Sequence, residues 1–231
     1  MHRNILFGSA SLLILAAIIL TIDACSMSRA SSSTVAAAFP NPTVDTRLAS
    51  SKSEQTAVLA GGCFWGIEAV FEHVKGVAHV ESGYSGGSPD AADYETVSSG
   101  RTGQAESVRI TYDPSQITYG RLLKVFFAVA HDPTELDRQG PDTGSQYRSA
   151  IFYANDEQKR VAESYIRQLD QAKIFPGKIV TEVSPLKSFS EAESYHQNYL
   201  ANHMNEPYIV SNDLPKLEAL RKQLPELYRE K

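Results

Sequence analysis

Cys63 is the residue of this sequence whose type and position best suit nucleophilic chemistry. It lies in the segment GGCFWG, residues 61–66, between an apolar run at 57–60 that predicts a buried strand and a helical apolar period over 64–74. A cysteine at the start of a helix faces unpaired backbone N–H groups and the positive end of the helix dipole, and both favour the reactive thiolate. The alternative is a structural cysteine buried beside Trp65, the only tryptophan of the chain. Position alone leaves both interpretations open.

Three clusters of polar side chains offer partners for this cysteine. They lie in or beside two long segments without a regular apolar period, 85–105 and 131–148, and long segments of this kind usually carry function. Taken singly, each cluster is more typical of turn chemistry or of packing at the edge of a core. The clusters are DYE at 93–95, GQAE at 103–106 and QGPDTGSQYR at 139–148.

The elements that must position these residues follow a β-α-β-β-α-β order, with a further helix and strand appended. This order predicts an α/β protein, a ferredoxin-like two-layer sandwich built on the split β-α-β unit, with additional helices and long active-site loops. Thr118 and Asn155 are the expected N-caps of two helices, and the pattern Ser190-x-x-Glu193 predicts a capping box. The expected strands are 57–60, 77–84, 107–112, 149–153 and 178–183, and the expected helices are 64–74, 118–129, 155–169 and 190–200.

Composition restricts the function classes. The chain has 231 residues and a net charge of −5 with no long basic run, so nucleic acid is not an expected partner. Its two cysteines form no C-x-x-C pattern, which argues against a zinc site or a disulfide framework. We therefore expect one globular domain without a metal or another cofactor.

The N-terminal segment has the character of an export signal. Residues 5–22 carry no charge, and the run ends in Ile22-Asp23-Ala24-Cys25, which resembles a bacterial lipobox with an unusual Asp two residues before the cysteine. This favours a signal peptide at 1–24, lipidation of Cys25, a flexible Ser- and Ala-rich tether at 25–53 and a catalytic domain at 54–231. Cleavage after Ala30 and an uncleaved membrane anchor are the alternatives. All three place the domain in the bacterial cell envelope or periplasm.

Taken together, the motifs that follow the N-terminal segment are no longer independent pieces of evidence. From about Gln55 to about Tyr228, the sequence closely resembles the peptide methionine sulfoxide reductase A family, whose fold is the α/β sandwich expected above. The motifs that carry the resemblance are GCFWG at 62–66, GYSGG at 83–87, YETV at 94–97, GQAE at 103–106, YDP at 112–114, HDPT at 131–134, RQGPDTGSQYRS at 138–149 and YHQNYL at 195–200.

The resemblance implies an enzyme that reduces the S epimer of methionine sulfoxide, free or in oxidised proteins. It assigns the nucleophile to Cys63 and the proton donor to Glu106. The remaining roles it implies are hydroxyls that hold the sulfoxide oxygen at Tyr94 and Tyr147, an apolar wall for the substrate methyl group at Phe64 and Trp65, and a residue that shapes the site at Asp142.

The chemistry requires these residue types independently of the family. A sulfoxide is a poor electrophile until its oxygen is protonated or strongly hydrogen-bonded, so its reduction needs a thiol on one side and acid donors on the other. A glutamic acid can donate near neutral pH only where a poorly solvated pocket raises its pKa. Two phenols supply neutral donors that strengthen as the S–O bond polarises.

Two features depart from the family pattern. Gln104 takes a position where many members carry histidine, and we expect it to tune the surroundings of Glu106. Many members also carry a second, resolving cysteine, but Ser98 occupies its loop position and residues 205–231 contain none. This predicts a single-cysteine cycle in a monomeric enzyme, in which a thioredoxin-like protein or a small thiol reduces Cys63.

Three other functions compete with this hypothesis. A thiol hydrolase or peptidase would need a histidine base for Cys63, and no histidine of the sequence lies in a recognisable nucleophile–base pattern. A cell-envelope thiol peroxidase would use Cys63 alone, since any activated thiolate reduces peroxide to some extent. A non-enzymatic peptide-binding lipoprotein would not need the cysteine at all.

Overall fold

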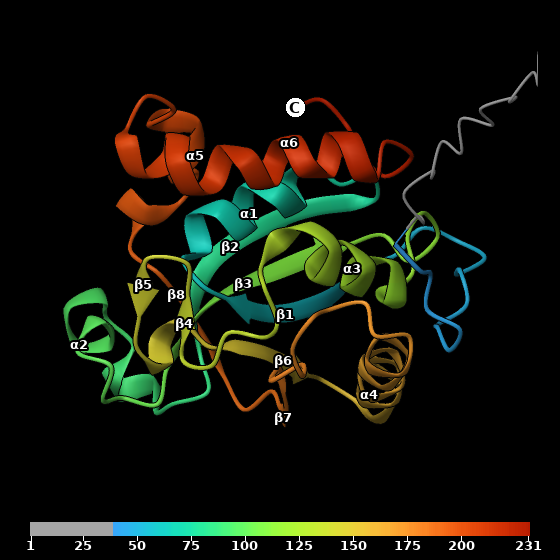
Figure 1. Ribbon diagram of the computed structural model, residues 1–231, viewed down its shortest axis with the longest axis horizontal. Coiled ribbons are helices and arrows are strands. Elements are labelled where there is room, and N and C mark those ends of the chain that lie inside the picture. The colour runs from blue at the N-terminus through green and yellow to red at the C-terminus, as the bar shows by residue number, and fades with distance from the viewer. Residues whose placement is uncertain (1–38) are drawn as a thin grey trace, which may run out of the picture. The chain divides into compact units, whose positions relative to one another are not determined.

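The computed structural model describes residues 39–231 (Figure 1). The expected signal peptide at 1–24 and the lipidation site Cys25 lie outside these residues. Within the described range, no helix is both long and apolar enough to cross a membrane. The strands are β1 (Gln55–Gly61), β2 (Val77–Ser85), β3 (Ala105–Tyr112), β4 (Arg138–Gln139), β5 (Asp142–Thr143), β6 (Ser149–Tyr153), β7 (Glu182–Pro185) and β8 (Phe189–Glu191). The α-helices are α1 (Phe64–Glu72), α2 (Tyr94–Ser98), α3 (Tyr119–Val125), α4 (Asp156–Gln171), α5 (Tyr199–Asn202) and α6 (Leu214–Gln223).

The sheet confirms the predicted fold class. Its six strands run in the order β7-β6-β1-β3-β2-β8. The central strands β6-β1-β3-β2 are antiparallel to their neighbours, and α1 and α3 are the two crossover helices of the split β-α-β unit. Strand β7 extends one edge in parallel with β6, and β8 extends the other edge antiparallel to β2.

Helix α1 lies at the centre of the molecule and carries the site at its N-terminus. Eight of its nine residues are buried, because the sheet covers one side while α5 and α6 lie over the other (Figure 1). A helix buried on all sides is normally apolar all round. Helix α1 departs from this rule at Glu68 and Glu72, which are 1% and 8% exposed.

The two isolated N-cap predictions are confirmed. The Thr118 side chain accepts a hydrogen bond from the Arg121 N–H, and that of Asn155 accepts one from the Gln158 N–H. Five further residues, Phe126–Ala130, continue α3 as a π-helix. Both caps depend only on the residues that follow them, which is why the sequence alone predicts them.

The prediction of a helix over 190–200 is wrong. Residues 189–191 form β8 and pair with 83–85 of β2, because that strand would otherwise end the sheet with an open edge. Glu193 does not form the predicted capping box with Ser190; its carboxylate accepts hydrogen bonds from the Tyr84 hydroxyl and the Tyr94 N–H. The last expected strand, 178–183, is observed slightly later as β7. The two segments expected as loops also contain α2 and the β4–β5 hairpin.

The flexible-tether prediction does not hold for the described part of that segment, residues 39–53. Phe39 and Val44 pack against the main core. The Asp45 carboxylate accepts hydrogen bonds from the Gly120 N–H at 2.7 Å and the Thr118 hydroxyl at 2.6 Å, so it caps the start of α3. The segment lacks regular secondary structure but is held by the domain.

Candidate active site

Cys63 is the residue that joins β1 to α1. Gly62 before it has φ +99°, and a Cβ there would lie 2.5 Å from Cγ of Gln139, so this position requires glycine. Cys63 is the N-cap of α1, as predicted, and its side chain makes no capping hydrogen bond to the first turn. Its side chain is 7% exposed, and among residues 39–231 it is the one free cysteine.

The expectation that the helix N-terminus makes Cys63 a resting thiolate is not supported. Burial raises the pKa of Cys63 well above its usual value, and the nearby Glu106 and Asp213 carboxyls raise it further. The Trp65 N–H and the Lys216 ammonium oppose this shift. Desolvation of the charged form thus outweighs the helix dipole, and the free site holds a thiol.

Glu106 lies beside this thiol, on β3 opposite Tyr84 of β2. It is 2% exposed, and its Oε2 accepts a hydrogen bond from the Phe64 N–H at 3.1 Å. Burial raises the pKa of Glu106 to about 8; Asp142 and Asp213 add to the shift, and the Phe64 N–H opposes it. The carboxyl therefore carries a proton at neutral pH, as an acid donor must.

Tyr94 and Tyr147 come from the two long segments and meet at Glu106. Tyr94 opens α2, where Asp93 is the N-cap and Glu193 binds the Tyr94 N–H at 2.9 Å. Burial, the Glu106 charge and the Cys63 charge all raise the pKa of both phenols, so these four groups form one electrostatic cluster. Both tyrosines therefore remain protonated hydrogen-bond donors.

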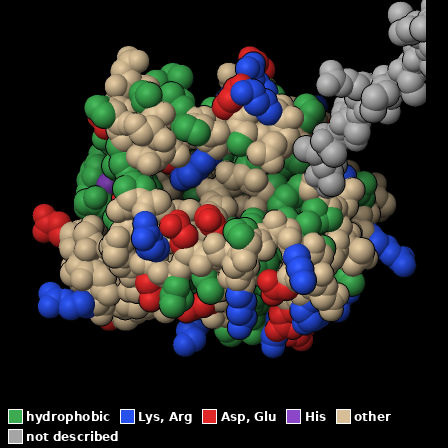
Figure 2. Space-filling view, viewed as in Figure 1, with side chains coloured by type: hydrophobic (Ala, Val, Ile, Leu, Met, Phe, Trp, Pro, Cys, Tyr) green, Lys and Arg blue, Asp and Glu red, His purple; other side chains and the backbone are tan. Residues whose placement is uncertain are grey.

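Asp142 borders a cavity that opens beside Cys63. The cavity has a volume of about 190 Å³ and lies between the β4–β5 hairpin and residues 208–216. Figure 2 shows that the molecule is hollowed on this face, below the layer that contains α6. The Asp142 carboxylate accepts a hydrogen bond from the Tyr208 hydroxyl at 2.5 Å, which ties the two sides of the cavity together.

The two aromatic residues after Cys63 have different environments. Trp65 is partly exposed, and its indole stacks on Tyr199 with ring centroids 3.8 Å apart and an interplanar angle of 10°. Its Nε1–H donates to Nδ1 of His196 at 3.2 Å. Phe64 is 1% exposed and packs against Tyr84 and His196. Of the two rings expected to form the apolar wall, Phe64 is thus the more deeply buried and Trp65 the more exposed.

Several residues of the site were not predicted. His196 and Tyr199 belong to the motif at 195–200, which contributed to the family resemblance, but the resemblance assigned neither residue a role. Tyr208 and Asp213 lie in a segment without any local signal. Asp213 is completely buried beside Gly66, and its carboxylate pairs with Lys216 at 3.0 Å.

The side-chain hydrogen bonds of Gln104 go to residues other than Glu106. Its side-chain amide accepts from the Gly87 N–H and donates to the Ser88 carbonyl, so it holds the end of β2 against the start of β3. Ser98 donates to the Tyr94 carbonyl within α2. In the part of the chain that the structure describes, no group of three His, Cys, Asp or Glu side chains could hold a metal ion.

Comparison with known proteins agrees with this geometry. The profile of the family described as "Peptide methionine sulfoxide reductase" matches residues 55–227. A protein of Mesorhizobium japonicum named "Peptide methionine sulfoxide reductase MsrA 2" is 59% identical over 177 residues, which cover 77% of this chain and 91% of that protein. A protein of the same name from Synechocystis sp. is 51% identical over 187 residues, which cover 80% and 87%.

Solved structures also match this chain. Reduced Mxr1 from Saccharomyces cerevisiae matches with a TM-score of 0.60 and 31% identity over 71% of this chain and 92% of that one. Methionine sulfoxide reductase A of Corynebacterium diphtheriae matches with a TM-score of 0.57 and 36% identity over 72% and 84%. The fold, the sequence profile and these relatives agree, and the chain belongs to the peptide methionine sulfoxide reductase family.

Proposed function

We propose that this chain reduces methionine (S)-S-oxide, free or within peptides, to methionine and thereby repairs oxidised proteins. The observation that carries the proposal is the protonated Glu106 carboxyl beside the buried Cys63 thiol. The names and the high identity of the relatives support the same reaction.

The chemical step uses both groups. The sulfoxide oxygen accepts hydrogen bonds from Tyr94 and Tyr147 and a proton from Glu106, which makes the substrate electrophilic. The Cys63 thiol loses its proton to the carboxylate left on Glu106 as its sulfur attacks. The substrate S–O bond breaks and an S–O bond to Cys63 forms. Cys63 becomes a sulfenic acid, and the methionine sulfur keeps the electron pair.

The Trp65 indole and the residues around it provide the apolar surface for the substrate methyl group, with Phe64 as support. Donors on one side and an aromatic wall on the other make the site chiral. A chiral site distinguishes the two sulfoxide epimers, because only one of them places its oxygen on the donors while its methyl group contacts the wall. Asp142 and Tyr208 shape the open side near Cys63.

An external thiol completes the cycle. It attacks the Cys63 sulfenic acid, releases water and forms a mixed disulfide, and a second thiol then restores Cys63. The support is that Cys63 is the only cysteine among residues 39–231. The reductant is a thioredoxin-like protein or a small thiol, and these steps require no resident cofactor.

Replacement of Cys63 by Ser tests the proposal. The variant should retain less than about 1% of the wild-type rate with N-acetyl-methionine (S)-sulfoxide amide, since the covalent step is lost. Wild-type protein turned over once without reductant should gain one oxygen atom by intact mass and react with dimedone. A Cys25→Ser variant is the matched control and should keep both properties. Substantial activity of the Cys63 variant would refute the nucleophile assignment.

The competing functions have less support. A thiol hydrolase needs a histidine bonded to its cysteine, but in residues 39–231 the histidine hydrogen bonds go to other partners. Burial lowers the pKa of His131 to about 4, and its ring bonds to Ser149 and to the Phe126 carbonyl. The peroxidase and peptide-binding alternatives do not use the acid at Glu106.

We also propose that the enzyme is exported to the bacterial cell envelope and is monomeric. The uncharged run at 5–22 and the lipobox-like residues 22–25 support export and lipidation at Cys25. Intact-mass analysis of protein purified from membranes should show a diacylglycerol or triacyl adduct on Cys25. Fractionation with the cytoplasm would contradict export, and light scattering of the purified protein measures the oligomeric state.

A further inference from the structure

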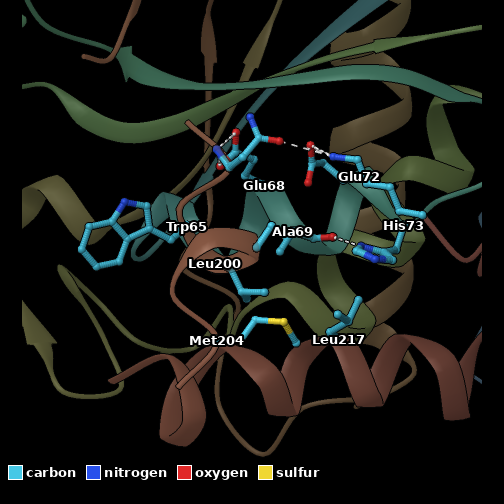
Figure 3. Close-up of a pocket in the computed structure, with 11 residues that line it drawn as sticks. Trp65, Glu68, Ala69, Glu72, His73, Leu200, Met204 and Leu217 are labelled. Carbon is cyan, nitrogen blue, oxygen red and sulfur yellow. Dashed lines mark hydrogen bonds and ion pairs between the residues drawn. The ribbon is translucent and has the colours of Figure 1, made fainter. Parts of the chain in front are cut away.

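A polar cluster lies behind the Trp65 wall, one helical turn along α1. Figure 3 shows Glu68, Ala69 and Glu72 of α1 on one side of a cavity and the apolar side chains of Leu200, Met204 and Leu217 on the other. The cavity has a volume of about 220 Å³ and separates α1 from the α5 and α6 segments. The cluster takes no part in the chemistry proposed above.

Glu68 binds one backbone amide with both carboxylate oxygens. Oε1 and Oε2 lie 3.1 and 3.0 Å from the N atom of Asn198. Asn198 has φ +54° and ψ +31°, a left-handed conformation that costs a non-glycine residue about 1 kcal/mol or more. An isolated carboxylate is also expensive to bury, so a side chain 1% exposed at this position indicates a specific need for an acceptor.

Asn198 is the residue immediately before α5, and the first residue of α5 is Tyr199, whose ring stacks on Trp65. Lys231 reaches the same cluster, where it pairs with Glu72 and lies 3.4 Å from Oδ1 of Asn198. The bonds to Asn198 therefore fix the start of α5, and with it the ring that the indole contacts.

We propose that Glu68 is a positioning residue that holds Tyr199 against Trp65 and so sets the substrate-facing indole. The proposal rests on the function proposed above. Glu68 acts through Asn198 and α5 and touches neither the substrate nor Cys63. Its role is to accept the Asn198 N–H, so a neutral acceptor of the same shape should replace it. Burial raises the pKa of Glu68 to about 7, which makes glutamine a close mimic of its neutral form.

Two variants separate the acceptor from the charge. Glu68→Gln keeps an oxygen for the Asn198 N–H, whereas Glu68→Leu fills the space without one. Trp65 is the only tryptophan, so its fluorescence reports the stack directly and needs no activity. We expect wild-type emission for Glu68→Gln and a changed emission intensity for Glu68→Leu. Glu157→Gln, at an exposed position in the first turn of α4, is the control and should leave the emission unchanged.

Single-turnover reduction of N-acetyl-methionine (S)-sulfoxide amide gives the second readout. Glu68→Leu should raise the half-saturating substrate concentration about tenfold, the effect of leaving one buried N–H without its partner. The saturated rate should change less than about threefold, because Cys63 and Glu106 are intact. Glu68→Gln should match wild type in both.

A double-mutant cycle with Tyr199→Leu keeps the test valid if Glu68→Leu is less stable. If Glu68 acts through Tyr199, the second substitution should add little to the effect of the first on the Trp65 emission or on the half-saturating substrate concentration. Additive effects would overturn the proposal, as would equal changes in Glu68→Gln and Glu68→Leu. The wild-type protein could instead show no turnover while the Glu68 variants show the expected fluorescence changes. That result would contradict the proposed function and leave the positioning role of Glu68 standing.

Discussion

Glu106→Gln should make the protein more stable and the enzyme slower, and the gain in stability should depend on pH. Glu106 is 2% exposed, and its pKa rises from 4.5 to about 8 on folding, mainly through burial. A carboxyl whose pKa is higher in the folded state favours folding fully below pH 4.5 and loses that contribution as the pH rises to 8. The folded state must take up a proton that the unfolded state lacks throughout this interval.

The magnitude follows from the shift. Each pH unit between 4.5 and 8 is worth about 1.4 kcal/mol, so by pH 7 ionisation of the unfolded chain has lowered the free energy of unfolding by about 3 kcal/mol. Above pH 8 the loss levels off at roughly 5 kcal/mol. Glutamine cannot ionise, and its Oε1 can still accept the Phe64 N–H, so the variant avoids this loss while keeping the local geometry.

Urea unfolding followed by Trp65 fluorescence at pH 4.5, 5.5, 6.5, 7.5 and 8.5 measures the effect. The difference in the free energy of unfolding between variant and wild type should grow by about 3 kcal/mol from pH 4.5 to 7. Glu54→Gln, which removes an exposed carboxyl just before β1, should give no such slope. A difference for Glu106→Gln that stays constant within about 1 kcal/mol would show that Glu106 titrates like a solvated acid, and the reasoning would fail.

The same substitution should slow reduction. Loss of a general acid lowers the chemical step by roughly 10²–10⁴-fold, with little change in substrate affinity. In the wild type, activity should also fall as the pH rises through about 8, because Glu106 then loses the proton that it donates. A stabilised variant with unchanged single-turnover formation of methionine would assign the proton to another group.

Three further results are expected. Tyr94→Phe and Tyr147→Phe should each slow single-turnover reduction about tenfold, less than Glu106→Gln, because either phenol can partly cover for the other; a double variant that loses no more than one single variant would contradict this cooperation. Asp45→Ala should lower the free energy of unfolding by about 1–3 kcal/mol in urea titrations, since it leaves the Gly120 N–H and the Thr118 hydroxyl without their acceptor, and an unchanged value would restore the tether interpretation for 39–53. With a racemic sulfoxide, chiral chromatography should show that only the S epimer is consumed, and equal consumption of both epimers would rule out the proposed chiral wall.

The sequence by itself determined the order of the main elements and indicated Cys63 as the candidate nucleophile. Apolar periods predicted β1, α1, β2, β3 and β6, and Thr118 and Asn155 marked two helix starts. These signals are local, because a period reports which side of one element is buried and a cap depends on the next three residues. The motifs around Cys63 and Glu106 were readable for the same reason: each is a short run of adjacent residues.

Only the tertiary structure decided how distant segments share space. It paired 189–191 with β2 and turned Glu193 from an expected helix cap into an anchor for Tyr94. It brought Asp213 and Tyr208 to Cys63 from a segment without any local signal. It also reversed the expected state of Cys63, since burial beside two carboxyls outweighs the helix dipole. Sheet edges, burial and electrostatic neighbours arise from contacts between residues far apart in the chain, and no local pattern encodes them.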